Sequence, residues 1–239
     1  MLNEPQTHRY VNTGVGGYGP VQYDALFRHL VERSGHRPSA VLVVTFMGND
    51  FQDCVWNQDH AVVDGILGGE VSLRAWVKRN FHLYRLVSNA YHRLAPRGRI
   101  DRYPRDMLYR PEAWQEDELL VAARPKYDQA FQSLAVQAKA LGVPLLVAII
   151  PTRETVDALR GEHELAGDPR LPASYAKKTF ARHGISTIDL TPILVAHDSR
   201  KTYLQFDGHL TPVGHRLVAD AVADQLVRLG PSTSREVEH

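Results

Sequence analysis

The 239-residue chain has a single cysteine, Cys54, so no disulfide can form within it. We expect Cys54 to be a packed loop residue rather than a nucleophile. No apolar run approaches the roughly 18 residues that a membrane-spanning helix needs, and no signal peptide is recognisable. The chain as given is therefore expected to be soluble.

The charges are nearly balanced, and the formal net charge of +1 predicts no general attraction to nucleic acid. The histidines show no spacing typical of metal ligands, so we expect neither a metal nor an organic cofactor. The histidines in question are His60, His82, His92, His163, His183, His197 and His215. We expect surface or packing roles for His82 and His92 and an exposed turn at His163.

Length and composition indicate one domain over residues 1–239, because 44% of the residues are hydrophobic and no internal repeat divides the chain. Residues 230–239 are expected to form a frayed polar tail. The sequence gives no indication of the oligomeric state.

Apolar periodicity predicts strands and helices that alternate along the chain. Helices are expected at residues 20–34, 126–141, 173–183 and 212–229. Buried strands are expected at residues 40–46, 145–150 and 187–190. This alternation is typical of an α/β sandwich, in which helices cover both faces of a parallel sheet. The polar residues 151–154 follow the second strand, and we interpret them as a solvated helix start rather than as pocket residues.

The segment Asp207-Gly208-His209 places a carboxylate and an imidazole two residues apart, just before the last helix. Thr211 suits the N-cap of that helix and Pro212 its first position. A catalytic base needs such a fixed location and a neighbouring carboxylate that orients it. We therefore expect His209 to be a base oriented by Asp207; the alternative is an ordinary loop before a helix.

Two further segments carry groups suited to an oxyanion hole. A glycine-rich turn at residues 12–19 exposes backbone N–H groups, and Gly48-Asn49-Asp50 follows the strand at residues 40–46. Ligands bind at the carboxyl ends of strands in open α/β sheets. Either segment alone is also consistent with a simple turn.

The order of these segments resembles the SGNH (GDSL-like) hydrolase family over residues 9–229. The resemblance implies a flavodoxin-like three-layer sandwich, with Gly17 and Asn49 as oxyanion donors and Asp207 and His209 as orienter and base. In the commoner family pattern the aspartate lies three residues before the histidine. The spacing of two resembles the branch that includes alginate O-acetylation proteins.

The family's serine nucleophile lies in a Gly-Asp-Ser block, and no such block occurs in this chain. We therefore assign no nucleophile to it. Only eleven residues precede Asn12, too few for a strand, an elbow and a helix. We expect the chain to begin inside the first helix of the fold and to lack the first strand. A targeting segment or membrane anchor would have been lost with that strand, so the localisation stays open.

Residues 51–118 read as an insertion into the fold. Its apolar and aromatic core at residues 71–94 predicts a helix, and the following arm contains Arg97, Arg99, Arg102, Arg105 and Arg110. We interpret it as a helical lid with a solvated charged face. Contact with a membrane surface or a polyanionic glycan is the alternative.

We expect an ester hydrolase, inactive as given because the serine block is absent, that would act on a small-molecule or glycan ester. The alternatives are a carbohydrate O-acetyltransferase or acetylesterase and a non-catalytic relative that binds a glycan or a membrane.

Overall fold

The computed structural model describes residues 10–34, 38–56, 62–63, 66–67, 105–205 and 208–229. Its centre is a parallel sheet of β1 (Val41–Phe46), β4 (Leu145–Ile150) and β5 (Ser186–Asp189), in the order β1-β4-β5. The continuous apolar sequence of β4 suits a central strand, because both of its faces are covered.

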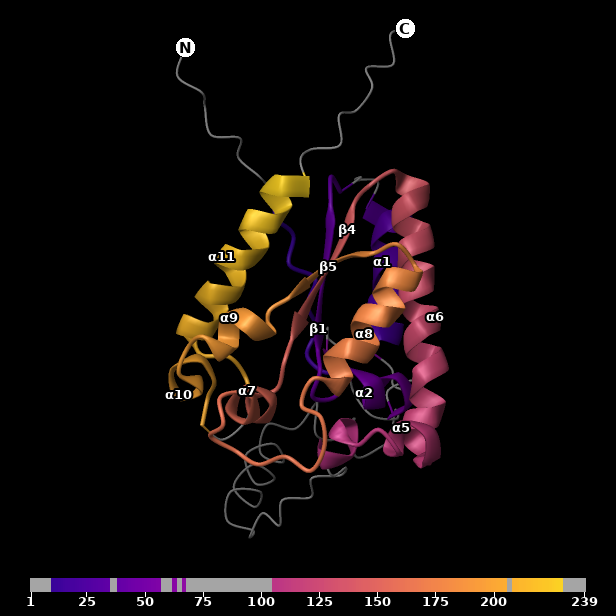
Figure 1. Ribbon diagram of the computed structural model, residues 1–239. Coiled ribbons are helices and arrows are strands. Elements are labelled where there is room, and N and C mark those ends of the chain that lie inside the picture. The colour runs from indigo at the N-terminus through magenta and orange to yellow at the C-terminus, as the bar shows by residue number, and fades with distance from the viewer. Residues whose placement is uncertain are drawn as a thin grey trace, which may run out of the picture.

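Helices lie on both faces of the sheet (Figure 1). One face carries α1 (Pro20–Ser34), α2 (Asp50–Trp56), α6 (Glu118–Leu141) and α8 (Leu171–Arg182). The other carries α7 (Arg153–Leu159), α9 (Thr191–Val195), α10 (Ser199–Thr202) and α11 (Pro212–Leu229). The side chains of β4 alternate between the two hydrophobic cores, with Val147 in the first and Ala148 in the second. The α/β prediction is confirmed.

Several short elements lie within the segment interpreted as an insertion. They are β2 (Val62–Val63) paired with β3 (Ile66–Leu67), the 3-10 helix η1 (Arg105–Tyr109) and α5 (Ala113–Glu116). The helix expected at residues 71–94 and the arm as far as residue 104 lie outside the described residues. Both ends of the segment contribute to the core: Phe51 packs edge-on against Trp114, with ring centroids 4.9 Å apart, and stacks on Tyr127 at 4.2 Å.

The start of α6 differs from the prediction. We expected the helix to begin at Lys126, after Pro125, whereas it begins eight residues earlier, at Glu118. The Asp117 side chain accepts hydrogen bonds from the N–H groups of Leu119 and Leu120, both at 3.1 Å, and so caps the earlier start. The helix therefore accommodates Pro125 in its interior. Helix α11 spans Pro212–Leu229, as expected.

The outer edge of β1 has no strand partner among the described residues. Tyr10 and Val11 are 77% and 74% exposed and form no strand. Leu42 and Val44, on the face shared with Ala148, are each 41% exposed. The described sheet thus has three strands, with β1 at one edge, and the absence of a first strand stays a prediction.

Within the described residues, no helix is long and apolar enough to cross a bilayer.

Candidate active site

The carboxyl ends of the parallel strands bring together three loops at the lower end of the sheet in Figure 1. Met47-Gly48-Asn49 connects β1 to α2, Pro151-Thr152 connects β4 to α7, and Leu190 connects β5 to α9. Functional groups collect at this edge in open α/β folds. The segments predicted to carry the site can be placed relative to these loops.

Asp53 links Asn49 to the glycine-rich turn. The Asn49 Nδ2 donates a hydrogen bond to Asp53 Oδ2 at 2.5 Å. A Cβ atom added to Gly19 would lie 2.7 Å from the Asp53 Cβ, so the end of the turn packs directly against this side chain. Gly17, two residues earlier, is exposed and has a left-handed backbone with φ of 86°. The structure therefore brings Asn49 and the turn that contains Gly17 into one region.

The amide of Asn49 keeps capacity for a ligand. A side-chain amide nitrogen carries two N–H groups, and the hydrogen bond to Asp53 uses one of them. The side chain is exposed at the edge of the sheet. Asn49 is thus held by Asp53 while one N–H donor remains for an oxyanion.

Asp50 is a buried carboxylate directly behind this surface. Its Oδ2 accepts hydrogen bonds from Thr45 Oγ1 at 2.7 Å, the Phe46 N–H at 3.0 Å and Tyr23 Oη at 3.3 Å. Burial raises the pKa of Asp50 to about 7, and the nearby Asp53 adds to this effect, although the hydrogen bonds offset part of it. These contacts fix the first turn of α2 and, with it, the backbone of Asn49.

His209 lies on an exposed loop between α10 and α11 that is anchored to the sheet edge. The Tyr203 hydroxyl donates to the Pro151 carbonyl oxygen at 2.9 Å, and Tyr203 forms an antiparallel bridge with Leu210. The Leu204 N–H donates to the His209 carbonyl oxygen at 2.7 Å. Pro151 follows β4, so these bonds place the loop at the same edge as Asn49.

The end of this loop has the capping geometry that the sequence indicated. Thr211 Oγ1 accepts a hydrogen bond from the Gly214 N–H at 3.2 Å, which confirms Thr211 as the N-cap of α11. Gly208 has φ of 71°, a conformation that other residues adopt at a cost. Asp207 lies outside the described residues, so its role as orienter stays a prediction. The convergence of His209 with Asn49 and Gly17 also stays a prediction.

Sequence reasoning missed the residues that support the site. Besides Asp53 and Tyr203, it missed Tyr109, whose hydroxyl lies 2.7 Å from Thr152 Oγ1 at the same β4–α7 turn. Tyr109 and Tyr203 are both almost fully buried, at 0% and 1% exposed. Pro151 and Thr152 directly follow a buried strand, which indicates that they lie at the site. This position does not identify Tyr203 and Tyr109 as their partners. Arg153 begins α7, which confirms the helix start, but Pro151 and Thr152 are buried and Arg153 and Glu154 are half-buried, so the expected solvation is wrong.

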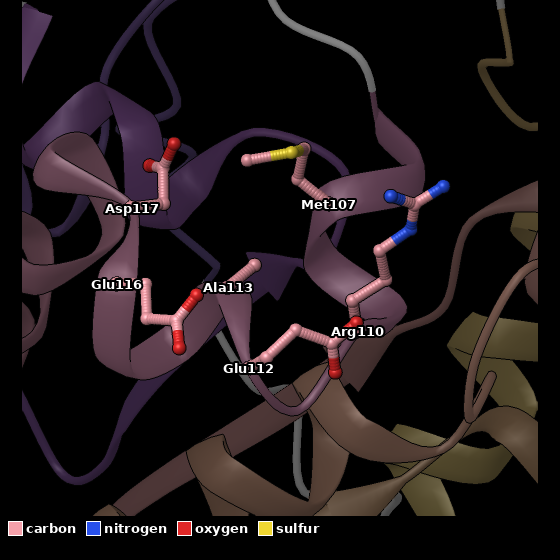
Figure 2. A pocket seen from close by; sticks show the side chains of 6 residues that line it. All are labelled: Met107, Arg110, Glu112, Ala113, Glu116 and Asp117. Carbon is pink, nitrogen blue, oxygen red and sulfur yellow. The ribbon is translucent and has the colours of Figure 1, made fainter.

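A separate hollow of about 310 Å³ lies beside η1 and α5. Figure 2 shows Met107 between Asp117 and Arg110, with Glu112 and Glu116 on the rim. Three carboxyl groups and one guanidinium line this hollow, so it is unsuited to a polyanion. Within the described ranges, no group of three or more His, Cys, Asp or Glu side chains has the geometry of a metal site.

Cys54 is buried in α2, where its sulfur donates to the Asp50 carbonyl oxygen at 3.2 Å. It lies in a helix rather than in the loop expected. Burial raises the pKa of its thiol, so the reactive thiolate is disfavoured.

Comparison with curated proteins finds no match for this chain. Comparison with protein families finds one that matches residues 105–238, described as "SGNH hydrolase-like domain, acetyltransferase AlgX". The match includes β4, β5, η1 and the Asp207-Gly208-His209 segment, and it covers more than half of the 239 residues. The chain therefore belongs to the family of SGNH hydrolase-like domains of the acetyltransferase AlgX.

Proposed function

We propose that this protein takes part in O-acetyl ester chemistry on an acidic polysaccharide of the alginate type. The observation that carries the proposal is the family match across the Asp207-Gly208-His209 segment. The anchoring of His209 at the carboxyl edge of the sheet supports it, because a base must have a fixed position relative to its substrate.

In this proposal His209 accepts the proton of an attacking hydroxyl and returns it to the alcohol that leaves when the C–O bond of the ester breaks, and Asp207 holds the imidazole in the required tautomer. The Gly17 N–H and the Asn49 amide stabilise the oxyanion of the tetrahedral intermediate. The hydroxyl that attacks the acetyl ester is not assigned to a residue, since the sequence contains no Gly-Asp-Ser block. The chain thus contributes the base, its orienter and the donors.

Acetyl transfer between sugars is favoured over simple ester hydrolysis, because the family that matches is described as an acetyltransferase. Hydrolysis remains the second candidate, since the same base and donors serve a water acceptor. We further propose that residues 1–239 form one domain with residues 51–118 as an insertion. The packing of Phe51 and Trp114 in the common core supports this single unit.

The proposal is tested by NMR titration of the 239-residue protein with O-acetylated mannuronate trisaccharide and with the same trisaccharide after deacetylation. The acetylated ligand is expected to bind more tightly and to shift the amide signals of Gly17, Asn49 and His209. His209→Ala should reduce this preference. His215→Ala is the matched control, because His215 is also exposed and lies on the first turns of α11.

Equal affinity for the two trisaccharides would contradict the proposal. So would signal changes that leave out His209 and Asn49, or an identical loss of preference in His209→Ala and His215→Ala. A non-catalytic binding protein would still bind a glycan but would show no dependence on the acetyl group at these residues.

A further inference from the structure

A second, partly enclosed groove lies between α8 and the turn that connects β5 to α9, with a volume of about 240 Å³. Arg170, Ser174 and Lys177 form one wall, because their spacing of four and three residues places them on one side of α8. Asp189, the last residue of β5, and Thr191 form the opposite wall. The groove therefore opens at the same carboxyl edge as the candidate active site.

The charge of this groove is opposite to that of the hollow in Figure 2. Residues 170–182 contain four Lys and Arg residues and no Asp or Glu. Lys177 Nζ lies 2.8 Å from Asp189 Oδ2. Burial opposes the ionisation of Asp189, but hydrogen bonds from Lys177 and Thr191 outweigh it and lower its pKa, so the Asp189 carboxylate stays ionised at neutral pH.

Lys177 is paired with Asp189, so Arg170 is the cationic side chain of the groove that can bind an anionic ligand. Its side chain is exposed at the groove, and it forms no ion pair with any residue that the structure describes. A guanidinium matches a carboxylate with two parallel hydrogen bonds. Ser174 and Asp189 add groups that bind sugar hydroxyls.

We propose that this groove binds a uronate unit of an acidic polysaccharide, with the sugar carboxylate on Arg170 and the sugar hydroxyls on Ser174 and Asp189. The inference rests on the proposed function, because it names a second subsite for the same substrate class. Helix α7 connects the two places: Thr155 lines the groove, and the turn before α7 holds the His209 loop through Pro151. The groove and the His209 loop therefore contact the same part of the chain, the β4–α7 turn and the first turn of α7.

The test uses trimannuronate without acetyl groups, with neutral mannotriose as the matched ligand. Amide signals of residues 170–177 and 189–191 are expected to shift with trimannuronate only. Arg170→Gln should weaken the binding about tenfold, because one charge-assisted contact is lost. Lys178→Gln, which removes the same charge from the next exposed residue of α8 beyond the groove, should leave the affinity unchanged.

Binding should also weaken as salt is added, since charge attraction at a solvent-open groove is screened. Equal effects of Arg170→Gln and Lys178→Gln would overturn the proposal, because only the general charge of α8 would then matter. Tight binding of mannotriose would overturn the carboxylate assignment. Trimannuronate shifts confined to Gly17, Asn49 and His209 would overturn the groove but leave the proposed function intact. Loss of the acetyl preference at those residues, with groove binding retained, would reject the proposed function alone.

Discussion

At the scale of single residues, the buried Asp50 holds the loop that carries Asn49 in place through its hydrogen bonds. All three of its hydrogen bonds go to Oδ2, from two hydroxyls and one backbone N–H. These donors hold the carboxylate, yet burial still favours its neutral form and raises its pKa to about 7. The stability of the protein is therefore expected to depend on pH through this residue.

The pKa of Asp50 is higher in the folded than in the unfolded chain, so between about pH 4 and 7 the folded state binds more protons. Its contribution to the free energy of unfolding is complete below pH 4 and is lost as the pH rises through 7. Asp50→Asn should remove this dependence, which amounts to a few kcal/mol at the order-of-magnitude level. Urea denaturation of both proteins from pH 4 to 8 measures it. Parallel pH profiles would refute the prediction.

The sequence predicted a polar loop after the strand, and Gly48 and Asn49 lie in that loop, whereas Asp50 begins α2 and is buried. The sequence did not indicate which residues form hydrogen bonds with the side chains of Asn49 and Asp50. Thr45, Tyr23 and Asp53 reach this loop from other elements or other turns, and the choice depends on three-dimensional packing. Local sequence patterns contain no information on such partners.

At the scale of structural elements, the loop that carries His209 has a buried tertiary anchor, Tyr203, and a more exposed contact, in which Arg153 Nη1 donates to the Gln205 carbonyl oxygen at 3.4 Å. The Tyr203 hydroxyl reaches the Pro151 carbonyl, and the hydrogen bond from Leu204 to His209 closes the loop. The position of His209 therefore depends on a tyrosine six residues before it. The sequence indicated the fixed helix start at Thr211 but not this anchor.

Tyr203→Phe removes the anchor without changing the shape of the side chain. It should lower the free energy of unfolding by about 1–3 kcal/mol, because the buried Pro151 carbonyl loses its donor. It should also speed hydrogen exchange at the Leu204 amide. Tyr109→Phe is the control, since it removes a hydroxyl contact at the same turn but not on the loop. An equal increase in Leu204 exchange in both variants would show that the anchor has no specific role.

The segment between α7 and α8 contains two glycines, Gly161 and Gly167, at which substitution by alanine should cost different amounts of stability. A Cβ atom at Gly167, where φ is 136°, would lie 2.1 Å from the Tyr109 carbonyl oxygen. At Gly161, where φ is 76°, it would meet no atom within 4 Å. Gly161→Ala should cost about 1–2 kcal/mol for the left-handed backbone alone. Gly167→Ala should cost at least about 2 kcal/mol more, because backbone must move. Thermal denaturation compares them, and equal costs would argue against the contact between Gly167 and η1.

At the scale of the whole molecule, the alternation of strands and helices was predictable because buried parallel strands form short apolar runs. The runs at residues 145–150 and 41–46 became β4 and β1 for this reason. Coverage of the sheet was not predictable to the same degree. Leu42 and Val44 are as apolar as their neighbours, yet they remain partly exposed because α11 packs over β4 and β5. Whether a strand at the edge of the sheet is covered depends on which helices pack over it, and this is set by the whole fold.

The activity of the 239-residue protein follows from which parts of the site it contains. It has the proposed base and oxyanion donors but no Gly-Asp-Ser block, so its turnover of an aryl acetate should lie far below that of an enzyme with a complete triad. Loss of the nucleophile alone costs on the order of 10⁶-fold in an enzyme of this type, because the groups act as a unit. Release of the aryl group, followed by absorbance for the protein and for His209→Ala, measures this rate. Rapid turnover that survives His209→Ala would place the chemistry elsewhere, and the assignment of His209 as base would then have to be abandoned.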